Sequence, residues 1–345
     1  MVVAEALSDL QTRLSRVRHQ ARHLGVAALL STGSRVLHRA LPSPVEPPDA
    51  ALRHHVTRGI SALVERDLAN VAAGRYPAAL LHFPLIELLR AAPELLLDLP
   101  QVALRMWRKR HVDLPPDVDV EAYPPYYRRN FHWQTDGWLS EHSARLYDLE
   151  VDLLFWGTTD LMRRMLLPPL TAALGSGRGA RVLDVACGTG RFLRQLQGAL
   201  PEARLYGVDL SPFYVEQARR TLGNPSVSLS AENAEALPFA DGFFDAVTST
   251  YLLHELPRHV RRNVLREARR VLKPGGLLVL GDSFQQADES SRELRYIHRW
   301  FPGTYHEPYY KDYVRDDLAA LAGECGFASP RAECFLLTKV LTARA

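Results

Sequence analysis

The sequence has 345 residues, of which 47% are hydrophobic and 23% are charged. This composition is typical of a soluble globular protein and excludes collagen, coiled coils and wholesale disorder. The 42 Lys and Arg residues nearly balance the 39 Asp and Glu residues, which leaves a net charge of +3. Proteins that bind nucleic acids usually carry a basic excess, so we expect no nucleic-acid partner. The length suggests two domains, or one domain with a large appendage.

The cysteines and the apolar segments indicate a cytoplasmic protein without a transmembrane segment. Cys187, Cys325 and Cys334 form neither a CxxC pair nor a zinc-binding pattern, so we expect reduced thiols and no metal site. Within the first thirty residues, acidic side chains precede the basic run, which is the wrong order for a signal peptide. The most apolar stretch, Pro77 to Leu104, is interrupted by charged residues and lacks the run of about 20 apolar residues that spans a bilayer.

The pattern of residues 1–115 predicts a mainly helical N-terminal region. Residues 1–30 are amphipathic, and the Pro-rich segment Leu41 to Pro48 ends this pattern. Asp49 can cap a second helix that runs to Gly74. The sequence leaves the role of this region open: it can cap a pocket, form a homo-oligomer contact or recognise a partner.

Residues 116–170 are predicted to form an aromatic-rich connector and lid. Prolines between positions 113 and 128 favour an extended chain. The following stretch, Tyr126 to Trp138, is rich in aromatic rings. These rings either line a pocket or pack the helical region onto the next domain, and both hypotheses carry equal weight.

From Arg181 onward, short apolar runs alternate with helical periodicity, a pattern that indicates βαβ units and a parallel sheet. We therefore assign residues 171–345 to a doubly wound, Rossmann-like α/β domain. The predicted strands are Arg181–Val185, Arg204–Val208, Val227–Leu229, Asp245–Ser249, Leu277–Gly281 and a pair within 331–342. The predicted helices include Arg191–Leu200, Pro212–Leu222, His259–Leu272 and Arg315–Cys325.

A turn of small residues follows the first predicted strand. Small residues at positions 186–190 let a ligand approach the backbone, and the helix that follows offers free N–H groups. Asp209 lies nineteen residues after Gly190, at the end of the next strand, where a carboxylate can accept hydrogen bonds from both hydroxyls of a ribose. Leu193 stands where the dinucleotide fingerprint needs glycine, which favours a nucleoside over NAD or FAD.

Five landmarks occur in one order: the loop Asp184 to Gly190, Asp209, and the runs 233–239, 244–247 and 273–276. With these landmarks, the segment from Asp184 to Ser283 resembles a class I S-adenosylmethionine-dependent methyltransferase, closest in style to the ubiquinone and menaquinone C-methyltransferases. The resemblance covers residues 145–345 at most. It implies a Rossmann-like methyltransferase sheet and S-adenosyl-L-methionine as the cofactor.

The resemblance also implies a cofactor-binding role for nine residues. The implied roles are methionine and ribose contacts for Ala186, Gly188 and Gly190, the methionine ammonium for Asp184, the ribose hydroxyls for Asp209, the adenine ring for Leu210, the adenine edge for Asn233 and Ala234, and the methionine moiety for Thr250.

Two positions depart from the family pattern. Ala186 stands where the family usually has glycine, and a methyl group is tolerable there if φ is negative. Asn233 stands where the family usually has aspartate. Its amide oxygen can still accept from the adenine amino group, so we expect altered affinity rather than lost binding.

Tyr251 and His254 are the candidate catalytic residues. They follow the fourth predicted strand at its carboxyl end, where open α/β sheets place their ligands. The imidazole of His254 titrates near neutral pH and can take a proton from an acceptor hydroxyl, amine or activated carbon. The alternative is a structural histidine that packs on or caps the following helix.

An aromatic insertion near residues 284–312 precedes the last helix. Together with the stretch Tyr126 to Trp138, it suggests an apolar pocket closed over the acceptor. The competing interpretation is the core of a helical subdomain.

We therefore expect a methyltransferase that acts on a small, apolar or aromatic organic acceptor at an O, N or C atom. One alternative is a regulatory or assembly protein that binds S-adenosyl-L-methionine without turnover. Another is an enzyme that uses this cofactor in a non-methylating reaction. A nicotinamide oxidoreductase ranks last.

Overall fold

The computed structural model describes residues 50–81, 85–223, 226–288 and 292–345. The expectations for residues 1–30, for Leu41 to Pro48 and for the cap at Asp49 lie outside these ranges. The predicted second helix is present as α2, Ala50–Ala72.

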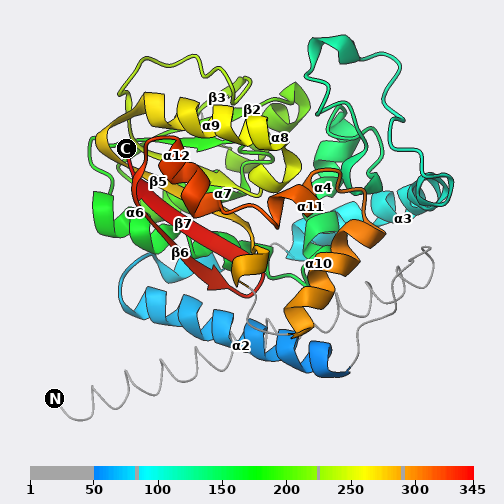
Figure 1. The fold of residues 1–345 in the computed structure, drawn as a ribbon, viewed down its shortest axis with the longest axis horizontal. Helices are drawn as coiled ribbons and strands as arrows, with labels where there is room; N and C mark the ends of the chain where they lie inside the picture. Colours follow the sequence, from blue (N-terminus) through cyan, green and yellow to red (C-terminus); the bar gives the residue numbers. More distant parts are fainter. Residues whose placement is uncertain (1–49, 82–84, 224–225, 289–291) are drawn as a thin grey trace.

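A seven-stranded mixed sheet forms the centre of the molecule (Figure 1). Its order is β3-β2-β1-β4-β5-β7-β6, and β7 is antiparallel to both of its neighbours. The predicted doubly wound, Rossmann-like α/β class is confirmed. The strands are β1 Arg181–Val185, β2 Arg204–Asp209, β3 Ser228–Ala231, β4 Phe244–Thr250, β5 Leu272–Ser283, β6 Ala328–Phe335 and β7 Thr338–Arg344.

Helices cover both faces of the sheet, as the alternation of side chains along a strand requires. On β1, Val182 belongs to the core formed with the helices of residues 161–200. Leu183 and Val185 point to the opposite face and belong to the core formed with the helices of residues 258–271 and 318–324. The helices within and around the sheet domain are α4 Glu141–Leu154, α5 Thr159–Arg164, α6 Leu167–Leu174, α7 Arg191–Ala199, α8 Pro212–Leu222, α9 Arg258–Val271, α10 Arg292–Thr304, α11 Tyr310–Tyr313 and α12 Leu318–Glu324.

Local signals account for the bounds of α8, which match the prediction. Ser211 caps its first turn by accepting a hydrogen bond from the N–H of Tyr214. Pro212 occupies the first helical position, where its missing N–H is harmless. Gly223 ends the helix with a φ of 57°. The last helix, α12, is shorter than predicted, because the side chain of Asp317 caps its first turn and the helix begins only at Leu318.

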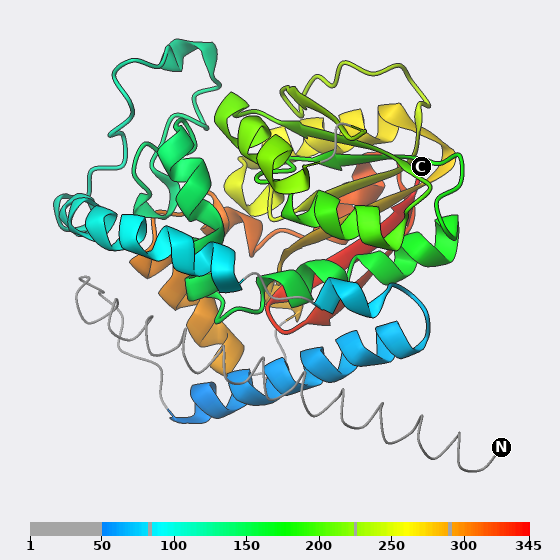
Figure 2. The same ribbon diagram turned by 180° about the vertical axis from the view of Figure 1, so that it is seen from behind.

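The N-terminal helix α2 belongs to the same core as the sheet domain. Leu63 and Val64 of α2 are buried with Leu161 and Met162 of α5. Figures 1 and 2 both show α2 on the side of the molecule away from α9. α2 thus contributes apolar surface to the face of the sheet that α5, α6 and α7 cover.

The helix α3, Leu85–Arg108, packs against α4 and leaves an apolar face exposed. Leu97 and Trp107 are 81% and 72% exposed. Within the described ranges, the helices are too short or too polar to cross a membrane.

The connector between α3 and α4 holds several residues with left-handed backbone. It contains the short 3-10 helices η2, Val120–Ala122, and η3, Phe131–Trp133. His132, Trp133 and Asp136 have φ values of 54°, 64° and 64°. Such conformations cost about 1 kcal/mol or more per residue and persist only where the surrounding contacts require them.

Candidate active site

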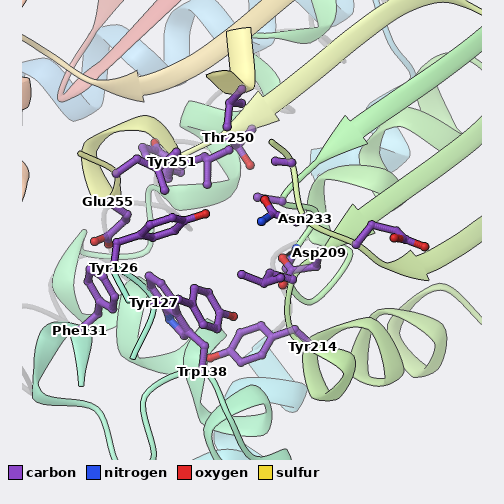
Figure 3. A pocket seen from close by; sticks show the side chains of 18 of the residues that line it. Tyr126, Tyr127, Phe131, Trp138, Asp209, Tyr214, Asn233, Thr250, Tyr251 and Glu255 are labelled. Carbon is purple, nitrogen blue, oxygen red and sulfur yellow. Dashed lines mark hydrogen bonds between the residues drawn. The ribbon is translucent and has the colours of Figure 1, made fainter. Parts of the chain in front are cut away.

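A cavity opens at the carboxyl ends of β1, β2 and β4, where a doubly wound sheet places its ligands. Figure 3 shows aromatic side chains of the connector on one side of the cavity, across from Asp209 and Asn233. The lining residues are Tyr126, Tyr127, Phe131, Trp138, Tyr147, Ala186, Gly188, Asp209, Leu210, Tyr214, Glu232, Asn233, Ala234, Thr250, Tyr251, Leu252, Glu255, Leu256 and Val264.

The turn after β1 lines the side of the cavity that holds Asp209 and Asn233, which we call the polar side. Ala186 and Gly188 line the cavity, and their φ values are 56° and 53°. The condition for tolerating a methyl group at Ala186, a negative φ, is therefore not met, because the chain bends here through left-handed backbone. Gly190 is not among the residues that line the cavity. A Cβ on it would lie 3.1 Å from the Cβ of Ala218, so Gly190 allows α7 and α8 to approach.

Asp209 ends β2 and is held by the backbone on both of its oxygens. Oδ2 accepts from the N–H of Gly188 and Oδ1 from the N–H of Ser211, each at 2.9 Å. Burial raises the pKa of this carboxyl to about 6, although these backbone hydrogen bonds favour the charged form. Each oxygen has a second lone pair, which can accept from a ligand hydroxyl.

Asp184 lies on β1 and is fully buried. Oδ1 accepts from the Thr248 hydroxyl at 2.7 Å, whereas Oδ2 has no hydrogen-bond partner among the described residues. Burial raises the pKa of Asp184 to about 7. Buried oxygens are normally satisfied, so this one fits a ligand that brings a donor, such as an ammonium group.

Asp184 is not among the residues that line the cavity, whereas four other predicted cofactor residues lie in its wall beside Asp209. Leu210, Asn233, Ala234 and Thr250 all belong to its wall. Asn233 accepts from the N–H of Glu235 with its Oδ1 at 2.8 Å, which fixes the orientation of the amide. One lone pair of this oxygen remains for a ligand donor.

Aromatic rings form the opposite wall. Phe131 and Trp138 are stacked, with ring centroids 4.2 Å apart. The hydroxyl of Tyr126 donates to Glu235 Oε1 at 2.9 Å, which ties the connector to the loop after β3. This wall matches the pocket hypothesis for the stretch Tyr126 to Trp138.

The two candidate catalytic residues differ in placement. Tyr251 lines the cavity with a φ of 57°, and its hydroxyl is paired with Thr338 Oγ1. Burial raises the pKa of Tyr251 to about 12. His254 is buried outside the lining, with Nδ1 2.6 Å from Asp282 Oδ1 and Nε2 3.4 Å from Glu255 Oε1. This placement fits the structural alternative for His254 rather than proton transfer with an acceptor.

Glu255 is a cavity residue that the sequence reasoning missed. It ends η4, Leu253–Glu255, and its side chain is 5% exposed. His132 Nε2 lies 3.3 Å from Glu255 Oε1 and 2.5 Å from Glu307 Oε1. Burial alone would lower the pKa of His132, but the two carboxylates raise it. Burial alone would raise the pKa of Glu255, but His254 and His132 lower it. His132 lies within the aromatic stretch that was predicted to line a pocket, but no local sequence pattern connects His132 with Glu307.

The insertion near residues 284–312 contributes Glu307 to this cluster, and its rings Phe301 and Tyr305 lie beside His132. Phe301 and Tyr310 are buried with ring centroids 4.9 Å apart, and the ring of Tyr305 lies beside that of Phe301 at 5.5 Å. The described residues of the insertion do not line the cavity. Their placement matches the subdomain-core interpretation.

Residues 182–276 match the family described as a methyltransferase domain. The demethylmenaquinone methyltransferase of Geobacillus kaustophilus is 34% identical over 187 residues, which cover 49% of this chain and 75% of that protein. The chain belongs to the S-adenosylmethionine-dependent methyltransferase family. It is an enzyme of this family, and S-adenosyl-L-methionine is its cofactor.

Other relatives share a smaller part of their length with this methyltransferase. The demethylmenaquinone methyltransferase of Beutenbergia cavernae is 40% identical over 139 residues, covering 40% of this chain and 54% of the relative. The chain thus spans three quarters of the first relative and about half of this one. Human N-acetylserotonin methyltransferase in complex with SAM is a structural neighbour at a TM-score of 0.46, with 16% identity over 59% of this chain and 56% of that one.

Proposed function

We propose that this methyltransferase acts on a small acceptor with a flat, apolar ring, held between the aromatic wall and the cofactor. One observation supports this proposal most directly: the cavity has a polar side around Asp209 and an aromatic side built by residues 126–138. The names of the curated relatives, demethylmenaquinone methyltransferases, agree with a ring-bearing acceptor.

On the polar side, we assign Asp209 to the ribose hydroxyls and Asp184 to the methionine ammonium. Asp209 keeps one lone pair on each oxygen, and Asp184 has a buried oxygen without a hydrogen bond among the described residues. Ala186, Gly188, Leu210, Asn233, Ala234 and Thr250 would complete the cofactor contacts, with Gly190 acting through helix packing. When bound, S-adenosyl-L-methionine supplies an activated methyl group to a nucleophilic oxygen, nitrogen or carbon.

On the aromatic side, the wall orients the acceptor and excludes water. The stacked pair Phe131 and Trp138 offers planar apolar surface, on which a ring packs in an offset or edge-to-face geometry. Alignment of the two reactants provides most of the catalysis that such a reaction needs. Tyr251, which follows β4, contributes its ring to the cavity lining rather than a group for proton transfer, because its hydroxyl is already paired with Thr338.

The test combines binding with turnover on the full chain. Calorimetry should show S-adenosyl-L-methionine bound at one site, and the Asp209→Ala variant should lose it. Label from the cofactor's methyl group should then enter phenols or reduced quinones, followed as organic-extractable product. Binding without transfer to any ring acceptor would favour the regulatory alternative, and absence of binding would refute the site.

A further inference from the structure

We propose that His132, Glu255 and Glu307 form a binding site for a divalent metal ion at the edge of the cavity. The three side chains come from η3, from the end of η4 and from the segment after α10. One donor atom from each lies within 4.8 Å of the others. Imidazole nitrogen and carboxylate oxygen are common ligands of first-row divalent ions such as Mn²⁺ and Zn²⁺.

Several buried polar atoms of these three side chains have no hydrogen bond in the described part of the chain. His132 Nε2 is close to Glu307 Oε1 and Glu255 Oε1, yet neither contact has the direction of a hydrogen bond. Both oxygens of Glu307 and Oε2 of Glu255 are likewise buried without a hydrogen bond in the described part of the chain. Buried polar atoms are rarely left so, and an ion at their centre would satisfy all three side chains.

The charges and the exposure of the cluster also suit a cation. The side chains of Glu255 and Glu307 are 5% and 1% exposed, so both carboxylates of the cluster are removed from water. His254 also approaches Glu255, but its Nδ1 is held by Asp282. A divalent ion would balance both carboxylates and would bind His132 in its neutral form.

Neighbouring groups hold the three donors in place. The backbone N–H of His132 donates to the carbonyl of His306, the residue before Glu307. Asp282 accepts from the N–H of Leu253 at 2.7 Å and orients His254 beside Glu255. Such surrounding contacts position metal ligands and tune affinity.

The metal site would also add a feature to the proposed acceptor, namely an oxygen atom that can bind the ion. Glu255 lines the cavity, so an ion held by three protein donors would keep open positions towards the acceptor. An acceptor oxygen could bind there and lose its proton more readily, as a phenol, a quinol or an enol does on a Lewis acid. This step rests on the proposed function, whereas metal binding itself can be tested without activity.

The test is Mn²⁺ binding to the full chain, measured by calorimetry and by electron paramagnetic resonance. We expect one ion per chain, and at least tenfold weaker binding in Glu307→Gln and in His132→Ala. The matched control is Glu94→Gln, which removes a carboxylate from the partly exposed His142–Glu94 pair and should leave the affinity unchanged. Calorimetry with S-adenosyl-L-methionine shows that each variant is folded.

Two results would overturn the proposal. One is Mn²⁺ and Zn²⁺ binding no tighter to the wild type than to the triple variant His132→Ala, Glu255→Gln, Glu307→Gln. The other is a crystal grown with Mn²⁺ in which no anomalous density lies between the three side chains. If the cofactor still binds and methyl transfer persists in either case, the proposed function stands and only the metal site falls.

Discussion

Gly188 donates its backbone N–H to Asp209 Oδ2 at 2.9 Å, so the turn after β1 directly orients the carboxylate at the end of β2. The two strands are parallel neighbours, which brings their carboxyl ends together. The glycine turn and the acid thus form one unit in space although they lie far apart in the chain.

Asp209→Asn should weaken S-adenosyl-L-methionine binding about 100-fold. Hydrogen bonds to a charged group contribute about 1.5–3 kcal/mol each. The variant removes the negative charge that accepts the two proposed hydrogen bonds from the ribose. Calorimetry measures the change. Asp241→Asn is the control, because its side chain is 82% exposed and forms a surface ion pair with Arg270. Equal affinity in wild type and Asp209→Asn would remove the ribose assignment.

Cofactor affinity should fall as the pH drops from 8 to 5. Burial raises the pKa of Asp184 to about 7 and that of Asp209 to about 6. Hydroxyl and ammonium donors favour the ionised carboxylates, so protonation below these values competes with binding. Below pH 6, Asp209 alone should weaken binding roughly tenfold per pH unit.

A ligand without the amino-acid part separates the two carboxyl groups. 5′-Methylthioadenosine should show only the change near pH 6, and this change should vanish in Asp209→Asn. A flat affinity profile for both ligands in the wild type would contradict the two assignments.

Substitution of Ala186 tests the left-handed turn. Its φ of 56° is accessible to glycine without strain, whereas a β-branched side chain is strongly disfavoured. Ala186→Val should lower the free energy of unfolding by about 1–3 kcal/mol and weaken cofactor binding, while Ala186→Gly should change stability by less than about 1 kcal/mol. Urea unfolding measures both; equal stability of the two variants would argue against the observed bend.

Arg164→Met should destabilise the fold by about 3–5 kcal/mol. Arg164 and Asp67 form a buried bidentate pair at 2.9 and 2.7 Å that joins α5 to α2. The variant would leave the buried Asp67 carboxylate without the guanidinium charge, although the Tyr76 hydroxyl still donates to it at 2.6 Å. The double variant Asp67→Leu, Arg164→Met should recover part of the loss. Arg178→Gln, at an exposed ion pair, should change the unfolding free energy by no more than about 0.5 kcal/mol.

Trp138→Leu should raise the KM for the acceptor about tenfold and leave the cofactor Kd unchanged. The variant removes the stacked partner of Phe131 and with it aromatic surface on the acceptor side. Steady-state kinetics with a reduced quinone gives KM, and calorimetry gives Kd. A loss confined to cofactor binding would place the cofactor against this wall instead.

Much of the sheet domain could be predicted because its signals are local. The apolar run of β1, the small residues after it and the capping signals around α8 each lie within a few neighbouring residues. Parallel strands joined by helices then bring Asp209 to the turn, since the carboxyl ends of such strands meet at one edge. The side of the cavity that holds Asp209 follows from these rules.

The sequence could not predict the sign of φ at Ala186 or the orientation of the His254 side chain. Backbone conformation in a tight turn depends on the contacts around it, and the residue type there only limits the choices. His254 does not line the cavity, and its ring is hydrogen-bonded to Asp282 on the neighbouring strand β5.

Local periodicity and turn chemistry therefore determined the strands, the helices and the small-residue turn after β1 of this protein. Tertiary structure alone decided that His132, Glu255 and Glu307 meet, and that α2 shares a core with the sheet. Glu255 lies 123 residues after His132 in the sequence, and Glu307 lies 52 residues after Glu255. Packing of whole elements sets such distances, and no short sequence pattern records them.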